Sequence, residues 1–221
     1  MKAVIYSGGT RRQNHQLNKE LIALLEGSNP HQITYVPIDG DEVSSYFKKF
    51  KSFFKPYGFK KFIKLNLNRK NSKKVLTEAF KSQVIFFAGG NTYELMKNIK
   101  ESGFSSEIKK FVRRGGIIAG ESAGVISLSP SINMAAIPSI DADLNDVGLK
   151  STKGLGIFDF EFSPHYISDT KSDREIKDYS QKISTPIYAC DDGDGIVVNN
   201  DTIYFIGRVW EFKKGRKNLI I

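Results

Sequence analysis

The sequence predicts an α/β protein, a three-layer sandwich in which a mostly parallel central sheet lies between helices on both faces. Strands and helices alternate through the first half of the chain, as in parallel sheets with crossover helices. Val84–Ala88 is a continuous apolar run, which is typical of a strand buried on both faces. The 221 residues are 40% hydrophobic and 26% charged, so we expect one domain over residues 1–221 with a full core.

The first half of the chain contains five predicted strands with helices between them. The strands are Ala3–Ser7, Ile33–Val36, Phe62–Leu65, Val84–Ala88 and Ile117–Ala119. The helices are His15–Glu26, a Lys/Phe-rich helix that includes residues 47–54, Val75–Lys81, a helix from Tyr93, and Ser105–Arg114. Asn91 and Glu94 form a capping box for the helix from Tyr93. Gly115 and Gly116 suit the C-terminal end of the helix before them.

The second half has a less regular pattern. Ser129–Lys153 contains two prolines, several aspartates and little periodicity, so we expect a long ordered loop with short pieces of structure. The predicted elements that follow are strands at Phe158–Phe162, Pro186–Cys190, Gly195–Val198 and Thr202–Ile206, with a helix at Ser172–Lys182. Residues 199–201 predict a hairpin loop between the last two strands.

The net charge of +9 has its main source between Lys48 and Lys74, where lysine and phenylalanine alternate. Phe47, Phe50 and Phe54 recur at helical spacing, which favours a surface helix whose phenylalanines pack on the core. A basic amphipathic helix that binds nucleic acid, a membrane surface or an acidic ligand is the alternative.

Cysteine content and hydropathy indicate the compartment. Cys190 is the single cysteine, which excludes an internal disulfide and favours the reducing cytoplasm. The first nine residues read as a strand and a turn, so we expect no signal peptide. No apolar stretch approaches the roughly 18 residues of a membrane span, and we expect no membrane partner.

Gly120–Gly124 (Gly-Glu-Ser-Ala-Gly) carries the strongest chemical signal. It follows a short apolar strand and opens a short helix, Ala123–Ser127, which is the context of a nucleophile elbow. Only small residues fit two positions before and after such a serine, and the N–H groups that open the helix face developing negative charge. We therefore predict Ser122 as a nucleophile. A glycine-rich turn without chemistry is the alternative.

A nucleophilic serine needs a base, and the chain has three histidines. His15 lies at the start of a helix and His31 in a loop after a proline. His165 lies just past a strand end, in Ser-Pro-His-Tyr, where catalytic groups of parallel sheets gather. We predict His165 as the base; a loop histidine with a structural hydrogen bond is the alternative.

The acid that orients the base is predicted in Asp191–Gly195 (Asp-Asp-Gly-Asp-Gly), at the end of another strand. We prefer Asp192 and expect its carboxylate within about 3 Å of His165. Asp191 would replace it if the strand phase is shifted by one residue, and Asp141 in the long loop is the other candidate. This cluster lacks the spaced ligands of a calcium loop. A solvated turn is the alternative.

An oxyanion hole requires two backbone N–H groups. Ala123 supplies one by position, and we assign the second to Gly90, where glycine lets the backbone approach a substrate. Gly8–Thr10 resembles a phosphate cradle but lacks the P-loop lysine and the Rossmann spacing. We interpret it as a structural turn and expect no cofactor and no metal.

These blocks resemble the peptidase family that includes dipeptidase E (aspartyl dipeptidase) and cyanophycinase. The matching segments are Ala88–Thr92, Gly120–Gly124, Ser163–Tyr166 and, more loosely, Asp191–Gly195, and their order and spacing fit nearly the whole chain. The resemblance implies a fold like that of class I glutamine amidotransferases. It also implies a Ser–His triad that hydrolyses peptide bonds, with Gly90 and Ala123 as oxyanion donors.

The sequence departs from dipeptidase E at two positions. About fifteen residues after the nucleophile, where dipeptidase E has an acid, this chain has Ile137, with Asp141 as the nearest acid. Cyanophycinase-like relatives place an acid in the late strand and turn, at the position of Asp192. Glu121 stands where dipeptidase E has an aromatic residue, and an acid there would disfavour an acidic residue at P1.

We therefore predict a serine peptidase that cleaves small peptides, with no nucleic-acid partner; N-terminal Asp-X dipeptides are one candidate substrate. Ser122, His165 and Asp192 are the predicted triad. An α/β-hydrolase esterase is one alternative, in which the acid precedes the histidine and Asp141 or Asp159 would serve. A non-catalytic basic binding module is the other.

Overall fold

A computed structural model describes residues 1–25, 27, 31–38 and 43–221. Its central sheet has seven strands in the order β3-β2-β4-β5-β1-β8-β9. The strands are β1 (Lys2–Tyr6), β2 (His31–Val36), β3 (Phe59–Lys64), β4 (Val84–Phe87), β5 (Ile117–Glu121), β8 (Gly195–Asn199) and β9 (Thr202–Ile206). The strands from β3 to β1 pair in parallel, whereas β8 and β9 pair antiparallel. The predicted mostly parallel sheet is confirmed.

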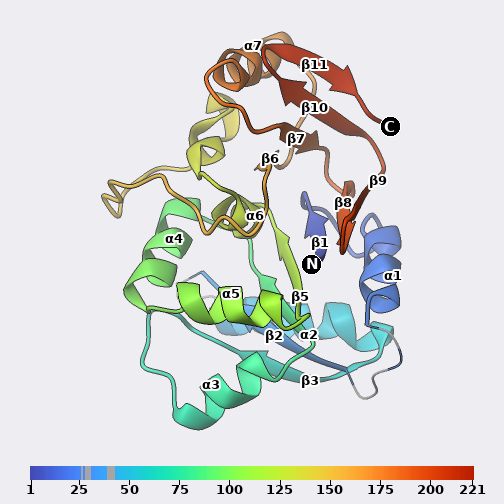
Figure 1. Ribbon diagram of the computed structural model, residues 1–221. Helices are drawn as coiled ribbons and strands as arrows, with labels where there is room; N and C mark the ends of the chain where they lie inside the picture. Colours follow the sequence, from blue (N-terminus) through green and yellow to red (C-terminus); the bar gives the residue numbers. More distant parts are fainter. Residues whose placement is uncertain (26, 28–30, 39–42) are drawn as a thin grey trace.

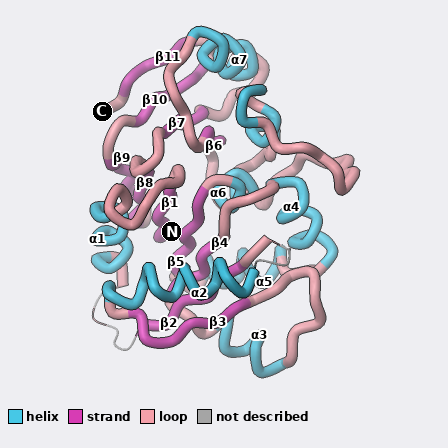
Figure 2. Tube along the Cα trace, turned by 180° about the vertical axis from the view of Figure 1, so that it is seen from behind, coloured by secondary structure: helices cyan, strands magenta, loops and turns pink. Residues whose placement is uncertain are grey.

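Helices cover both faces of this sheet (Figures 1 and 2). The helices are α1 (His15–Ala23), α2 (Val43–Phe54), α3 (Lys73–Phe80), α4 (Thr92–Glu101), α5 (Ser105–Arg113) and α6 (Ala123–Leu128). Alternate residues of β5 belong to the two hydrophobic cores, one on each face of the sheet. Ala119 lies in the core that includes residues of α1 and α2, and Ile118 lies in the core that includes residues of α3, α4, α5 and α6. This is the two-sided burial that the apolar strands predict.

A second sheet, of four strands in the order β11-β10-β7-β6, lies beyond the carboxyl end of β5 (Figure 1). The strands are β6 (Glu161–Ser163), β7 (Ile187–Cys190), β10 (Val209–Lys213) and β11 (Arg216–Leu219), and α7 (Thr170–Ser180) packs on β10 and β11. The 3-10 helices are η1 (Lys55–Tyr57), η2 (Asn133–Ala136) and η3 (Ser139–Asp141). The last two give the long loop its short pieces of structure, as predicted.

The Lys/Phe-rich segment forms α2, whose Phe50 and Phe54 are buried against the sheet. The prediction of a surface helix with a packed phenylalanine stripe is confirmed. The predicted end of the first helix, Glu26, lies outside the described residues, and α1 ends at Ala23.

The strand predicted at Phe158–Phe162 is displaced: β6 begins at Glu161, and residues 157–160 form bends. Phe158 and Phe160 are both buried and their rings stack with centroids 5.1 Å apart. The backbone amides of Ile157 and Phe158 bond to the Leu128 carbonyl instead of to a strand. The alternating apolar residues that predict a strand here therefore belong to a loop that is hydrogen-bonded to the end of α6.

Candidate active site

The turn between β5 and α6 holds Ser122 in a strained conformation, with φ 48° and ψ −120°. Its neighbours must be small, because a Cβ on Gly124 would lie 2.3 Å from the Phe87 carbonyl oxygen and one on Gly120 3.1 Å from it. This is the geometry of a nucleophile elbow, in which the turn lifts the serine clear of the sheet.

Ser122 faces a hollow of about 340 Å³ at the carboxyl end of the central sheet, called here the Ser122 hollow. Its walls include Ser122, His165, Gly90, Asp141 and Asp143. The first three were predicted as site residues from segments more than thirty positions apart in the sequence. The structure thus brings the predicted nucleophile, base and second oxyanion donor to one opening.

His165 forms the expected hydrogen bond with Asp192, with 2.7 Å between Nδ1 and Oδ1. This contact occupies Nδ1 and leaves Nε2 as the ring nitrogen available to Ser122. No hydrogen bond joins Ser122 and His165, both of which the structure describes. Catalytic hydrogen bonds are often long without substrate.

The other acids have different contacts. Asp191 accepts the Asp192 backbone N–H at 2.7 Å, and Asp194 accepts the Arg208 N–H at 3.0 Å. Asp141 lines the Ser122 hollow but forms no hydrogen bond with His165 in the described residues. Asp192 is therefore the carboxylate in contact with His165; its catalytic role stays a prediction.

The two remaining histidines lie away from the Ser122 hollow. His15 lies 3.2 Å from the Tyr57 hydroxyl, measured from Nδ1. His31 is buried beside Phe59 with ring centroids 5.7 Å apart.

The predicted oxyanion donors, Gly90 and Ala123, have backbone N–H groups that donate no hydrogen bond to any described residue. Ala123 opens α6, where the first N–H groups lack partners within the helix. Gly90 has φ +130°, and a Cβ there would meet the Ile38 side chain at 2.8 Å, so this position requires glycine. Both amides remain predictions as oxyanion donors.

Ser7 and Gly8 contribute to the site in a way that sequence reasoning missed. His165 has φ 52°, and its backbone N–H donates to Ser7 Oγ at 2.7 Å. That hydroxyl donates in turn to the Cys190 carbonyl at 2.7 Å. A Cβ on Gly8 would lie 2.4 Å from His165 Cε1 and 2.5 Å from Asp192 Oδ1. The turn after β1 therefore holds the His165–Asp192 pair; its place at the end of a central strand was the available signal.

The electrostatics of the site are acidic. Asp141 and Asp143 line the Ser122 hollow and no lysine or arginine among the described residues does so. Burial raises the pKa of Glu121, an effect that the nearby Gly89 backbone N–H and the charge of His165 partly offset. The described residues include no cluster of three metal-ligating side chains. None of the described helices has the length and apolar character needed to cross a bilayer.

Comparison with known proteins decides the family. The sequence model of Peptidase family S51 matches residues 3–206. The chain belongs to peptidase family S51. It is accordingly a serine-type peptidase, and the resemblance inferred from its motifs is confirmed.

The relatives of this S51 peptidase are named as peptidases, and a solved peptidase structure has a similar fold. It is 28% identical over 178 residues to the uncharacterized peptidase Lmo0363 of Listeria monocytogenes, covering 80% of this chain and 82% of that one. It is 27% identical over 148 residues to Peptidase E of Salmonella arizonae, covering 62% of each. A crystal structure of a peptidase from an acI-B1 Actinobacterium superposes with a TM-score of 0.74 at 18% identity, covering 99% of this chain and 93% of that one. This structural match supports the fold.

Proposed function

We propose that this S51 peptidase hydrolyses dipeptides and other small peptides through an acyl-enzyme on Ser122. The observation that carries the proposal is the His165–Asp192 hydrogen bond at the rim of the hollow that Ser122 faces. A carboxylate on Nδ1 fixes the tautomer whose Nε2 accepts the serine proton.

In the proposed reaction, Ser122 Oγ attacks the peptide carbonyl carbon while His165 Nε2 takes the hydroxyl proton. The N–H groups of Gly90 and Ala123 donate to the carbonyl oxygen as it becomes negative. His165 then protonates the leaving amine, and the acyl group remains on Ser122. Water, deprotonated by His165, releases the acid and restores the serine. Asp192 keeps the imidazole oriented and stabilises its charge.

The order of these residues argues against the esterase alternative. In α/β-hydrolases the acid precedes the histidine along the chain, whereas the carboxylate that contacts His165 here follows it. The S51 match likewise supports a peptidase over a binding module. The cytoplasmic location stays a prediction from the single cysteine.

A dipeptide library tests the proposal. The full chain is incubated with X-Leu dipeptides, including Asp-Leu, and free leucine is measured for the protein and for Ser122→Ala. We expect cleavage of several dipeptides by the protein and none by the variant. Cleavage that survives in Ser122→Ala, or no cleavage of any dipeptide, would contradict the proposal.

A further inference from the structure

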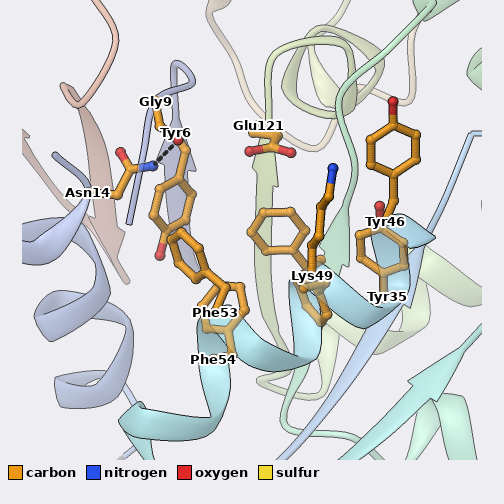
Figure 3. A pocket seen from close by; sticks show the side chains of 11 residues that line it. Tyr6, Gly9, Asn14, Tyr35, Tyr46, Lys49, Phe53, Phe54 and Glu121 are labelled. Carbon is orange, nitrogen blue, oxygen red and sulfur yellow. Dashed lines mark hydrogen bonds between the residues drawn. The ribbon is translucent and has the colours of Figure 1, made fainter. Parts of the chain in front are cut away.

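A second hollow lies on the opposite face of the sheet from the Ser122 hollow, between the sheet and α2 (Figure 3). It measures about 300 Å³, and aromatic side chains from β1, β2, β4 and α2 line it, among them Tyr6, Tyr35 and Phe86. We call it the aromatic cavity. The volume is sufficient for one long amino-acid side chain, and nothing in the proposed reaction uses it.

Glu121 connects the aromatic cavity with the nucleophile. Its carboxylate lies at the cavity's mouth, above the aromatic rings (Figure 3). A Cβ placed on Gly89 would lie 3.4 Å from Glu121 Cγ and 3.5 Å from Ser122 Cβ, so Gly89 adjoins both side chains. A group bound by Glu121 therefore lies beside the same glycine that adjoins Ser122.

No lysine or arginine among the described residues forms an ion pair with the Glu121 carboxylate, although His165 stabilises its charge. Lys49 also lines the aromatic cavity, but its Nζ lies over the Tyr46 ring, 5.4 Å from the centroid. The nearby Gly89 backbone N–H favours the charged form of the carboxylate. A partly desolvated carboxylate binds a cation more strongly than an exposed one does.

We propose that Glu121 and the aromatic cavity form a subsite for a positively charged nitrogen group on the acyl side of the substrate. The group is either the α-ammonium or the side chain of a lysine or arginine residue whose carbonyl Ser122 attacks. This inference rests on the proposed function, because it takes Ser122 as the nucleophile.

Three features favour a cation over the other groups that a peptide offers. The α-ammonium nitrogen is two bonds from the attacked carbon, which matches the adjacency of Glu121 and Ser122. Aromatic faces attract ammonium and guanidinium groups, and they accept the methylene stem of a lysine. An acidic side chain would meet Glu121 on this side and Asp141 and Asp143 on the other.

The test compares kcat/KM of the full chain and of Glu121→Gln on Lys-Leu, norleucine-Leu, Asp-Leu and N-acetyl-Lys-Leu. We expect Glu121→Gln to lower kcat/KM for Lys-Leu at least tenfold. If the side chain is the bound group, N-acetyl-Lys-Leu falls with Lys-Leu, norleucine-Leu changes less than threefold, and Asp-Leu is unchanged or faster. If the α-ammonium is bound, the three unblocked dipeptides fall together and the acetylated one does not.

The matched control is Glu161→Gln, which changes a buried carboxyl outside both hollows and should preserve the substrate preference. An equal loss on all four substrates, or no change on any, would overturn the inference. Glu121→Asp, which keeps the charge, should lower kcat/KM for Lys-Leu less than Glu121→Gln does.

Binding separates this inference from the proposed function. Calorimetry with lysinamide on Ser122→Ala, with and without Glu121→Gln, requires no turnover. We expect at least tenfold weaker binding when Glu121 is replaced, and equal or undetectable binding to both would overturn the subsite. A protein that cleaves no dipeptide yet shows this loss contradicts the proposed function alone.

Discussion

The Ser122 hollow and the aromatic cavity are built in different ways. The residues of the Ser122 hollow lie on backbone turns. Ser122 and His165 both have a positive φ, and the neighbouring glycines have no room for a Cβ. The aromatic cavity is made of core side chains with Glu121 at its mouth. The difference suggests that one side performs the reaction and the other selects the substrate. Changes in the first should lower kcat, and changes in the second should alter preference.

The largest effect is expected for Ser122→Ala, which removes the nucleophile from the Ser122 hollow. We expect dipeptide hydrolysis to fall by about 10⁴-fold or more, because the members of a triad act as a unit. His165→Ala should cost nearly as much, whereas His15→Ala and His31→Ala should cost little. Rates of leucine release measure this. Equal losses from all three histidine variants would indicate a folding role and break the distinction between the hollows.

Asp192→Asn should have the next largest effect. The amide keeps the shape but favours the wrong histidine tautomer, so we expect kcat to fall by about 10² to 10⁴-fold with a small change in KM. Asp141→Asn, which changes a carboxylate that lines the Ser122 hollow, is the matched control. Should Asp141→Asn give the larger loss of kcat, the assignment of the acid is wrong while Ser122 and His165 still stand.

Ser7→Ala tests whether the turn after β1 positions His165. It leaves the His165 N–H and the Cys190 carbonyl without the Ser7 hydroxyl, at a cost of roughly 1–3 kcal/mol. We expect kcat to fall about 3- to 30-fold while KM stays within twofold. Ser127→Ala, which removes a buried hydroxyl without a hydrogen bond in the described residues, is the control. Loss of thermal stability without a fall in kcat would show that Ser7 has a structural role only.

The smallest effect on activity is expected for Glu161→Gln, outside both hollows. Burial raises the pKa of Glu161 to about 7 from its ordinary value of 4.5, partly offset by the Tyr179 hydroxyl. The folded state therefore binds this proton more tightly, and the resulting stability is present below pH 4.5 and lost as the pH rises through 7.

Urea unfolding at pH 5 and pH 8 measures this contribution. Glu161→Gln should reduce the difference in unfolding free energy between the two pH values by about 1 to 3 kcal/mol. Glu101→Gln makes the same change at an exposed position and should leave the difference unaltered. An unchanged difference in Glu161→Gln would mean that this carboxyl ionises as it does in the unfolded chain.

Periodicity and motif spacing predicted the parallel sheet well, because strands such as β4 and β5 are apolar on both faces and lie beside glycine turns. The second sheet was harder to foresee. β10 and β11 carry charged residues between apolar ones, and β10 gains its partner β7 from residues about twenty positions away. Their pairing depends on tertiary contacts rather than on a local pattern.

The same contrast between local patterns and long-range contacts applies to the site. The position of Ser122 follows from a local turn, so its neighbours Gly120 and Gly124 indicate it directly. The support of His165 by Ser7 joins residues 158 positions apart, and one serine before two glycines gives no local sign of that contact. The aromatic cavity was hidden for a related reason, since its rings read as ordinary core residues.

The most direct test of the central claim is to detect the acyl group on Ser122. The full chain is mixed with alanine p-nitrophenyl ester, quenched with acid within milliseconds, and analysed by intact and peptide mass spectrometry. We predict a burst of nitrophenol and an alanyl adduct on the peptide that contains Ser122, both absent from Ser122→Ala. Enzymatic hydrolysis with the adduct on another residue, or with a burst that persists in Ser122→Ala, would contradict the account.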